Sequence, residues 1–191
     1  LDTLPDSEFL QGLAETLKHG VISDPALFDF MADNAEAILF RNEEPLTRII
    51  KDALNIKICH VENDELDKSG RIKLNFGHTF AHAYEQIYEY LSVRHGESVA
   101  AGMVAAARLG RKLGTCDQAY VDRLIEVLEK FNLPTHFPKA RSESILGALS
   151  RDKKHKAGAF TFVLPVRIGE VKIVNDVSKE AVLDVLDEIS A

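Results

Sequence analysis

The stretch LNFGHTFAHAYEQIYEYLSVRHGESVAAGM, residues 74–103, decides the fold expected for this chain. Its apolar residues recur at helical spacing on either side of a short polar junction, which predicts two helices, about Gly77–Leu91 and Glu97–Leu113. Three of the seven histidines of the chain fall within eighteen residues of this stretch. Because His95 lies just before the second helix, a helical hairpin would bring it back beside His78.

The same helical period extends through most of the chain. Further helices are predicted from Asp6 or Ser7 to Gly20, from Asp24 to Leu39, from Pro45 to Leu54, from Asp117 to just before Leu133, after Ser142, and from Ser178 onward. Phe160–Leu164 and Val171–Val174 predict a small β-hairpin around Ile168–Gly169, whereas residues 62–70 are charged and indicate a loop. Because no repeat or linker is evident, residues 1–191 are expected to form one mostly α domain with one small β-hairpin near 160–174.

The composition is that of a globular protein with an acidic balance. A net charge of −7 and a pI near 5.5 argue against nucleic acid or an anionic membrane as the main partner. No apolar run approaches the roughly 20 residues needed to span a bilayer, and the opening LDTLPDSEF is not expected to be a signal peptide. Cys59 and Cys116 stand alone and are expected to be reduced, buried thiols in a cytoplasmic protein.

The histidine cluster predicts a metal site. His78 and His82 are four residues apart and share one helical face, and neutral imidazole is a suitable zinc ligand. Spacing does not choose which two of His78, His82 and His95 would bind, and an isolated HxxxH pair also occurs on solvent-exposed helices. A carboxylate would complete a three-ligand site, and the candidates are Glu15, Glu85, Glu89 and Glu97. From spacing alone, Glu15 is better explained as the partner of Lys18 in an exposed i, i+3 ion pair.

Basic residues are concentrated in two regions of this acidic chain. Lys57 and Arg71 precede the histidine helix, and the loop Arg151–Lys156 reads RDKKHK. Arg71 lies four residues before Asn75 and could hold an anion close to a bound metal, because guanidinium pairs well with carboxylate or phosphate. The alternatives are a solvated lysine cluster for the loop and a helix N-cap for Asn75, and local sequence favours the N-cap.

Several runs of sequence together resemble one known family. The segments GLAETLK (12–18), NDELDKSGRIKLNFGHTFAHAYE (63–85), HGESVAAGM (95–103) and RDKK (151–154) closely resemble, in this order, segments of the 3-dehydroquinate synthases. The similarity covers essentially the whole chain. LNFGHTFAHA and HGESVAAGM are specific to the wider sugar-phosphate cyclase group, while Arg71, Asn75 and Lys153 point to its dehydroquinate branch. The implied fold is the multi-helical C-terminal domain of this family.

The resemblance implies roles that spacing alone does not give. It implies that Glu15, His78 and His95 hold Zn²⁺ or Co²⁺, so that Glu15 becomes a ligand. His82 would instead contact the substrate near its phosphate and help to move protons. It implies that Lys18 and Lys57 contact polar groups of the substrate around the metal. Anionic groups of the substrate would be held by Arg71, Asn75 and Lys153. NAD would be contacted by Leu1, Asp2 and Thr3.

The resemblance also implies an activity. A 3-dehydroquinate synthase is a phosphorus–oxygen lyase of the shikimate pathway, which leads through chorismate to the aromatic amino acids. It converts 3-deoxy-D-arabino-heptulosonate 7-phosphate to 3-dehydroquinate and phosphate by NAD- and metal-dependent oxidation, elimination, reduction and aldol closure.

The resemblance further implies a second domain. We expect an N-terminal NAD-binding α/β domain to be absent from this chain, so that the chain binds metal weakly without turnover, and we expect the full-length protein to be a homodimer. The alternatives are a related cyclase acting on another sugar phosphate, an iron-type polyol dehydrogenase, and a non-enzymatic metal-sensing module.

Overall fold

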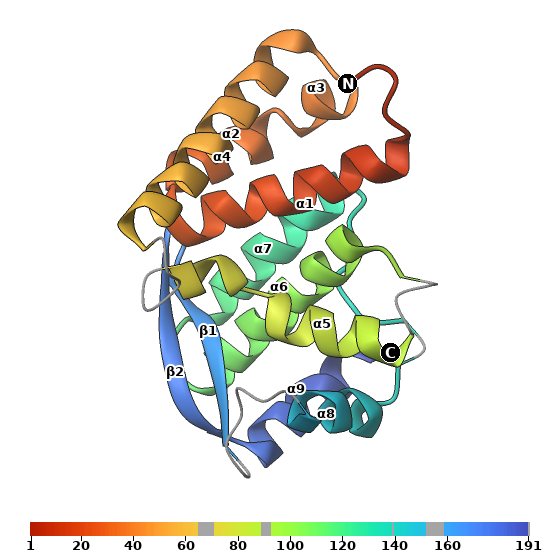
Figure 1. Cartoon of the computed structure of the whole chain (residues 1–191), viewed down its shortest axis with the longest axis vertical. Helices are drawn as coiled ribbons and strands as arrows, with labels where there is room; N and C mark the ends of the chain where they lie inside the picture. Colours follow the sequence, from red (N-terminus) through yellow and green to blue (C-terminus); the bar gives the residue numbers. More distant parts are fainter. Residues whose placement is uncertain (65–70, 89–92, 139, 152–158, 191) are drawn as a thin grey trace.

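The structure is a computed structural model that describes residues 1–64, 71–88, 93–138, 140–151 and 159–190 (Figure 1). The elements within these residues are α1 (Asp6–Ser23), α2 (Pro25–Asp33), α3 (Ala35–Leu39), α4 (Glu43–Asn63), the 3₁₀ helix η1 (Arg71–Asn75), α5 (His78–Ile87), α6 (His95–Lys112), α7 (Gln118–Lys130), α8 (Ser142–Arg151), β1 (Ala159–Arg167), β2 (Glu170–Ser178) and α9 (Lys179–Ile189). The prediction of a mostly helical chain with one β-hairpin is confirmed. Helices α1–α4 gather at one end of the molecule, α8 and α9 lie at the other, and the hairpin runs along one side.

Helix α6 is the centre of the domain. It packs against α1, α5, α7, β1 and α9, and every residue from Ser98 to Ala107 is buried. Alanine and glycine make up most of this run, so neighbouring helices approach α6 closely. A helix that is apolar on all sides is stable when other elements surround it, and this one is surrounded.

The start of α5 rests against the middle of α6. A Cβ atom added to Gly102 would lie 2.2 Å from the carbonyl oxygen of Gly77, so there is room for no side chain at this crossing. Gly77 is the N-cap of α5 and has a φ of +80°, a left-handed conformation that glycine adopts without strain. The crossing therefore fixes the position of His78, the first residue of α5.

Three predicted helix starts are confirmed by their caps. Asp24 Oδ1 accepts hydrogen bonds from the backbone N–H groups of residues 26 and 27, at 2.9 and 3.2 Å, at the start of α2. Asp117 Oδ1 accepts from the N–H of residue 120 at 2.9 Å, and Ser178 Oγ accepts from the N–H of residue 181 at 3.2 Å. These side chains satisfy N–H groups that a helix start otherwise leaves without partners.

Two predicted boundaries near the N-terminus are wrong. Helix α1 continues past Gly20 to Ser23, because Gly20 allows close packing rather than ending the helix: a Cβ there would lie 2.9 Å from the backbone nitrogen of Phe28. The predicted helix from Asp24 to Leu39 is divided at Asn34, whose side-chain amide donates to the carbonyl of Phe30 at 2.9 Å.

Other boundaries around the histidine segment also differ. Helix α4 begins before Pro45 and continues to Asn63, into the stretch predicted as a charged loop, because its polar residues face solvent along one side of the helix. Asn75 is not the N-cap of the histidine helix, since Gly77 takes that position. His95 is the first residue of α6 instead of preceding it, and the predicted end of the histidine helix at residue 91 lies outside the described residues.

The hairpin is longer than predicted and ties the two ends of the domain together. β1 pairs antiparallel with β2 in a register that places Phe162 opposite Val174, with irregularities on either side. Phe162 stacks on Phe80 of α5 at 4.8 Å between ring centroids. At the turn, the N–H of Gly169 donates to the carbonyl of Val21 at 2.9 Å, so the hairpin is anchored to both α5 and α1.

The two cysteines differ in exposure. Cys59 lies on the exposed side of α4, so the prediction that it is buried is wrong, whereas Cys116 is partly buried and its thiol donates to the carbonyl of Ala107 at 3.4 Å. Among the described residues, no helix combines the length and apolar character needed to cross a membrane.

Candidate metal centre

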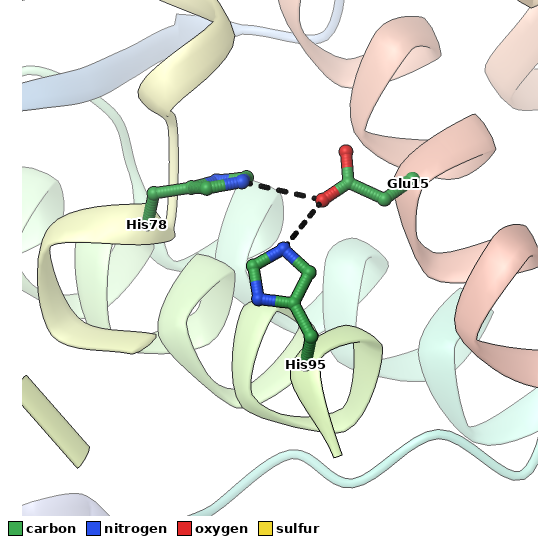
Figure 2. Close-up of side chains that lie close together, drawn as sticks. All are labelled: Glu15, His78 and His95. Atoms are coloured by element: carbon green, nitrogen blue, oxygen red, sulfur yellow. Dashed lines mark ion pairs between the residues drawn. The ribbon is translucent and has the colours of Figure 1, made fainter. Parts of the chain in front are cut away.

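Three helices bring Glu15, His78 and His95 to one point (Figure 2). Glu15 comes from α1, and the histidines are the first residues of α5 and α6. His78 Nε2 lies 3.2 Å from Glu15 Oε1, and His95 Nε2 lies 3.4 Å from the same oxygen. Both imidazole rings point at this carboxylate oxygen, so the three residues predicted as metal ligands are adjacent in space.

The arrangement of these atoms fits a divalent metal. Two ligands bound tetrahedrally at about 2.1 Å from zinc lie about 3.4 Å apart, which is close to the two separations at Glu15 Oε1. That oxygen is buried, and no described residue forms a well-aligned hydrogen bond with it, although both imidazole nitrogens are near. A buried acceptor between two imidazole nitrogens is stabilised by positive charge, which a divalent cation or a proton on one of the rings would supply.

The outer nitrogens of the two rings support the same interpretation. His78 Nδ1 lies 3.2 Å from the carbonyl oxygen of Phe76, and His95 Nδ1 lies 2.8 Å from a carboxylate oxygen of Glu85. Both partners are acceptors, so each Nδ1 carries the proton and donates. In the neutral rings, the Nε2 lone pairs are then directed at Glu15, as metal coordination requires.

The electrostatics of the site centre on Glu15. Burial by itself would raise the pKa of Glu15, but the contacts with His78 and His95 and the charge of Lys18 outweigh it and hold the pKa well below its usual range. Contacts with Glu15 and Glu85 raise the pKa of His95 to about 9, against the effect of burial. In the absence of metal, a proton on His95 therefore supplies positive charge to the cluster.

Lys18 is a buried partner of Glu15. Its Nζ lies 2.6 Å from Glu15 Oε2, with the lysine side chain 5% exposed. The interpretation of this pair as an exposed ion pair is therefore wrong, because α1 is covered by α2, α4 and α6 at this level. Burial lowers the pKa of Lys18, the charge of Glu15 opposes this, and nearby Lys57 adds to it.

A cavity of about 440 Å³ opens beside the triad. Its described lining is Glu15, Lys18, His19, Lys57, Arg71, Leu74, Asn75, His78 and His95. Two lysines, an arginine and an asparagine predicted to contact substrate thus share one cavity with the three residues predicted as metal ligands. A larger cavity of about 570 Å³ lies at Tyr84, His136 and Phe137, and its described lining includes Glu97, but it contains none of Glu15, His78, His95 and the basic residues predicted to contact substrate.

The other residues predicted to act in the site lie outside the metal cavity or outside the described residues. His82 lies 5.4 Å from His78 between ring centroids, yet it lines a separate cavity of about 390 Å³ between α5 and α8. Lys153 falls outside the described residues. Leu1, Asp2 and Thr3 are exposed and do not line the metal cavity, and the carbonyls of the first two accept hydrogen bonds from Arg41 Nη1 at 3.0 and 3.3 Å.

Sequence reasoning missed His19. It is 8% exposed, it lines the metal cavity, and its Nδ1 is buried with no hydrogen-bond partner among the described residues. Burial, then the charge of Lys18, lowers the pKa of His19 to about 4. The feature of the sequence that could have identified His19 is its position directly after Lys18, on the helix that carries Glu15.

The depressed pKa of His19 predicts a pH dependence of stability. The folded state holds this imidazole neutral down to about pH 4, whereas an unfolded chain protonates it below about pH 6.5. Between these pH values the unfolded state therefore binds more protons than the folded state. The contribution of neutral His19 to the free energy of unfolding is fully present above pH 6.5, and up to about 3 kcal/mol of it is lost as the pH falls to 4. His19→Gln should remove most of this loss in urea unfolding at pH 7 and pH 4.5.

The control for this measurement is His136→Gln, which alters an exposed histidine. It should retain the pH dependence of the wild type. If His19→Gln and His136→Gln lose equal stability between the two pH values, His19 is not the group responsible.

Comparison with known proteins identifies the family. The family described as 3-dehydroquinate synthase C-terminal matches residues 12–155. The chain belongs to the 3-dehydroquinate synthase family. A 3-dehydroquinate synthase from Dictyoglomus turgidum is 40% identical over 188 residues, which are 98% of this chain and 53% of that protein. The chain therefore spans about half the length of the 3-dehydroquinate synthases that it resembles.

Solved structures show the same fold. The 2-epi-5-epi-valiolone synthase of Streptomyces hygroscopicus subsp. jinggangensis, with NAD⁺ and Zn²⁺ bound, superposes with a TM-score of 0.87 at 24% identity, over 98% of this chain and 52% of that one. A 2-deoxy-scyllo-inosose synthase in complex with carbaglucose-6-phosphate, NAD⁺ and Co²⁺ gives 0.85 at 21% identity, over 98% of this chain and 54% of that one. The chain thus shares its fold with part of each of these two enzymes.

Proposed function

We propose that the chain is the metal- and substrate-binding half of a 3-dehydroquinate synthase, which converts 3-deoxy-D-arabino-heptulosonate 7-phosphate to 3-dehydroquinate and phosphate. The observation that carries the proposal is the convergence of Glu15, His78 and His95 beside a cavity lined by basic side chains. Membership of the 3-dehydroquinate synthase family supports the choice of reaction.

Glu15, His78 and His95 would hold the metal through one carboxylate oxygen and two Nε2 atoms. A Zn²⁺ or Co²⁺ ion held there would supply Lewis acidity, which would favour oxidation of a substrate hydroxyl by NAD. Lys18 already pairs with the second oxygen of Glu15 at 2.6 Å, so it fixes the direction in which this carboxylate presents its other oxygen. Burial lowers the pKa of Lys18 against the opposing charge of Glu15, and its amino group would contact a substrate hydroxyl by a hydrogen bond.

The remaining cavity residues orient a multiply charged substrate. Lys57 and Arg71 line one cavity with the metal ligands, and both match the charge of a phosphorylated keto acid. Asn75 offers an amide at the same cavity, and Lys153 would add a further charge. His82 lines the adjacent cavity between α5 and α8, with its ring 6.1 Å from that of His95 between centroids, and from there it would move a proton near the substrate phosphate.

The oxidation step needs NAD, which we assign mainly to an N-terminal domain. This chain covers 53% of the Dictyoglomus protein, and both solved cyclases contain NAD⁺ in chains about twice as long. Leu1, Asp2 and Thr3 would contribute the last contacts to it. The whole enzyme would be a homodimer.

A related cyclase with another substrate is the second candidate. The likeness in fold to the valiolone and inosose synthases favours it. The identity of 40% to a 3-dehydroquinate synthase, against 24% and 21% to those enzymes, favours dehydroquinate. Turnover of the two-domain protein with each sugar phosphate in turn would decide between them.

The test of the proposal joins the N-terminal half of the Dictyoglomus turgidum enzyme to Leu1 of this chain. The fusion should release phosphate and form 3-dehydroquinate from the heptulosonate phosphate, and the activity should require NAD⁺ and disappear with EDTA. Turnover of a different sugar phosphate alone would exclude the dehydroquinate assignment.

The 191-residue chain by itself should show no turnover. Most of the NAD contacts are assigned above to the half of the relatives' length that this chain does not span. With Zn²⁺, NAD⁺ and substrate, phosphate release should stay at background, while the intact Dictyoglomus turgidum enzyme is active in the same assay. Dehydroquinate formation by the isolated chain would contradict the division of labour proposed here.

A further inference from the structure

A buried carboxylate stands behind one of the two histidine ligands. Glu85 lies in the second half of α5, with its side chain 5% exposed, and its Oε1 is 2.8 Å from Nδ1 of His95. This contact is on the side of the ring opposite Glu15. Glu85 is not one of the three converging ligands, and the proposed function gives it no role.

The two histidine ligands differ in how they are held. The side chain of His78 is 14% exposed, and its Nδ1 donates to the carbonyl of Phe76, which the start of α5 fixes in place. The side chain of His95 is 47% exposed and belongs to the first residue of α6. Packing therefore restrains the His78 ring, whereas the His95 ring depends on its hydrogen bond to Glu85 for its orientation.

The position of Glu85 is unfavourable for stability without a further role. Burial of a carboxylate costs several kcal/mol unless a cation or several hydrogen bonds compensate. Among the described residues, no lysine or arginine lies within ion-pair distance of Glu85, and its charged partner is His95. His95 is itself half exposed, and its Nε2 is directed at the proposed metal site. We therefore interpret the Glu85 carboxylate as the group that orients the His95 ring.

We infer that Glu85 is a positioning residue that holds the Nδ1–H of His95 and thereby directs Nε2 to the metal. Its negative charge also makes the imidazole a stronger donor to the metal. Carboxylates in this position typically raise metal affinity 10- to 100-fold. This inference rests on the metal site of the proposed function, and it adds a residue that acts through His95 without touching the metal.

One competing arrangement uses the same atoms. His82, Glu85 and His95 also offer ligand atoms within 4.8 Å of one another, so they could hold a second metal ion. The two arrangements exclude each other, because His95 Nδ1 cannot donate a proton to Glu85 and bind a metal at the same time. The number of metal ions per chain therefore distinguishes them.

The test is a competitive Zn²⁺ titration of the 191-residue chain against a chromophoric chelator. Wild type should bind one ion, and Glu85→Gln should bind one ion 10- to 100-fold more weakly. Glu85→Asp, which keeps the charge on a shorter side chain, should lie between them. Glu97→Gln is the matched control, since it alters a glutamate two residues from His95 that is 44% exposed, and it should stay within about twofold of wild type.

A spectroscopic readout separates positioning from a general effect on folding. In Zn²⁺-loaded wild type, ¹⁵N-edited NMR should show a slowly exchanging, downfield Nδ1–H of His95, as expected for a hydrogen bond to a carboxylate. In Glu85→Gln this signal should move upfield, while far-UV circular dichroism and the urea midpoint of the loaded protein show a folded chain.

Each outcome has a defined meaning. Equal affinity and an unchanged Nδ1–H signal in Glu85→Gln would overturn the inference and leave the proposed function intact. Two ions per wild-type chain, reduced to one in Glu85→Gln, would replace positioning with a second metal site. If wild type binds no metal, the proposed function fails, and the inference fails with it.

Discussion

Glu15→Ala should lower the Zn²⁺ affinity of the chain on the order of 1000-fold. A bound zinc ion gains about 10–16 kcal/mol from four ligands, or about 3–4 kcal/mol for each, and 4 kcal/mol corresponds to about 1000-fold. Glu15 supplies the anionic oxygen to which both His78 Nε2 and His95 Nε2 are nearest, at 3.2 and 3.4 Å. Its removal leaves two imidazoles, which is fewer ligands than a zinc site normally has.

The same substitution has a second effect, on stability. Lys18 is 4% exposed and pairs with Glu15 at 2.6 Å, so Glu15→Ala leaves a buried ammonium group without its partner. Loss of one member of a buried pair typically costs about 3–5 kcal/mol. Glu15→Gln, which retains the size of the side chain and one hydrogen-bond acceptor, is therefore the second variant to measure.

Isothermal titration with Zn²⁺ and a chelator-competition assay would measure the loss of Zn²⁺ affinity in both variants. Glu8→Ala is the matched control, because it removes an exposed glutamate from the same helix, and it should bind as the wild type does. Wild-type affinity in folded Glu15→Gln would remove Glu15 from the ligand set and return it to the role of a structural partner of Lys18.

The proposed metal ligands illustrate how far sequence alone could go. The spacing of His78 and His82 pointed to this segment, but i, i+4 residues can share a helix face without sharing a cavity. His78 is directed at Glu15 on α1, whereas His82 lines the cavity toward α8. Glu15, which we propose as the carboxylate ligand, lies 63 residues before His78 in the sequence, and no local pattern predicts such a pairing. Resemblance to the family supplied it.

Burial was the other quantity that spacing did not give. Glu15 and Lys18 form an ordinary i, i+3 pair in sequence, and their burial follows from the packing of other helices against α1. Glu85 was one of four candidate ligands, but the role proposed for it behind His95 depends on how α5 and α6 pack together. Caps such as Asp24, Asp117 and Ser178 were predictable because their hydrogen bonds are local.

Glycines near the site show the same division between local and tertiary causes. Gly20 has a sequence context typical of a helix end, yet α1 continues through it because Phe28 lies against it. A glycine required by close packing and a glycine required by a turn are identical in the sequence. The two kinds of glycine are distinguished by the backbone atoms that lie against them in the fold. A glycine required by close packing near the site gives a second prediction with a large effect.

Gly102→Ala should both destabilise the chain and weaken metal binding. The added Cβ would lie 2.2 Å from the carbonyl oxygen of Gly77 and 3.2 Å from the backbone nitrogen of Ala81. These neighbours are backbone atoms of α5 and its N-cap, so no side chain can turn away, and α5 must move outward by about 1 Å to restore ordinary contact. His78 directly follows Gly77 and would move away from Glu15. We expect a loss of about 3 kcal/mol in the free energy of unfolding and a fall of at least about tenfold in Zn²⁺ affinity.

Gly147→Ala is the control that makes this prediction specific. Gly147 also lies within a helix, α8, but nothing would lie within 4 Å of an added Cβ. Replacing an exposed helical glycine by alanine stabilises a helix by up to about 1 kcal/mol, so the two identical substitutions should change the urea midpoint in opposite directions. If Gly102→Ala keeps wild-type stability and metal affinity, the crossing of α5 and α6 is looser than its glycines indicate. His78 would then owe its position to the metal and to Glu15 more than to the packing of its helix.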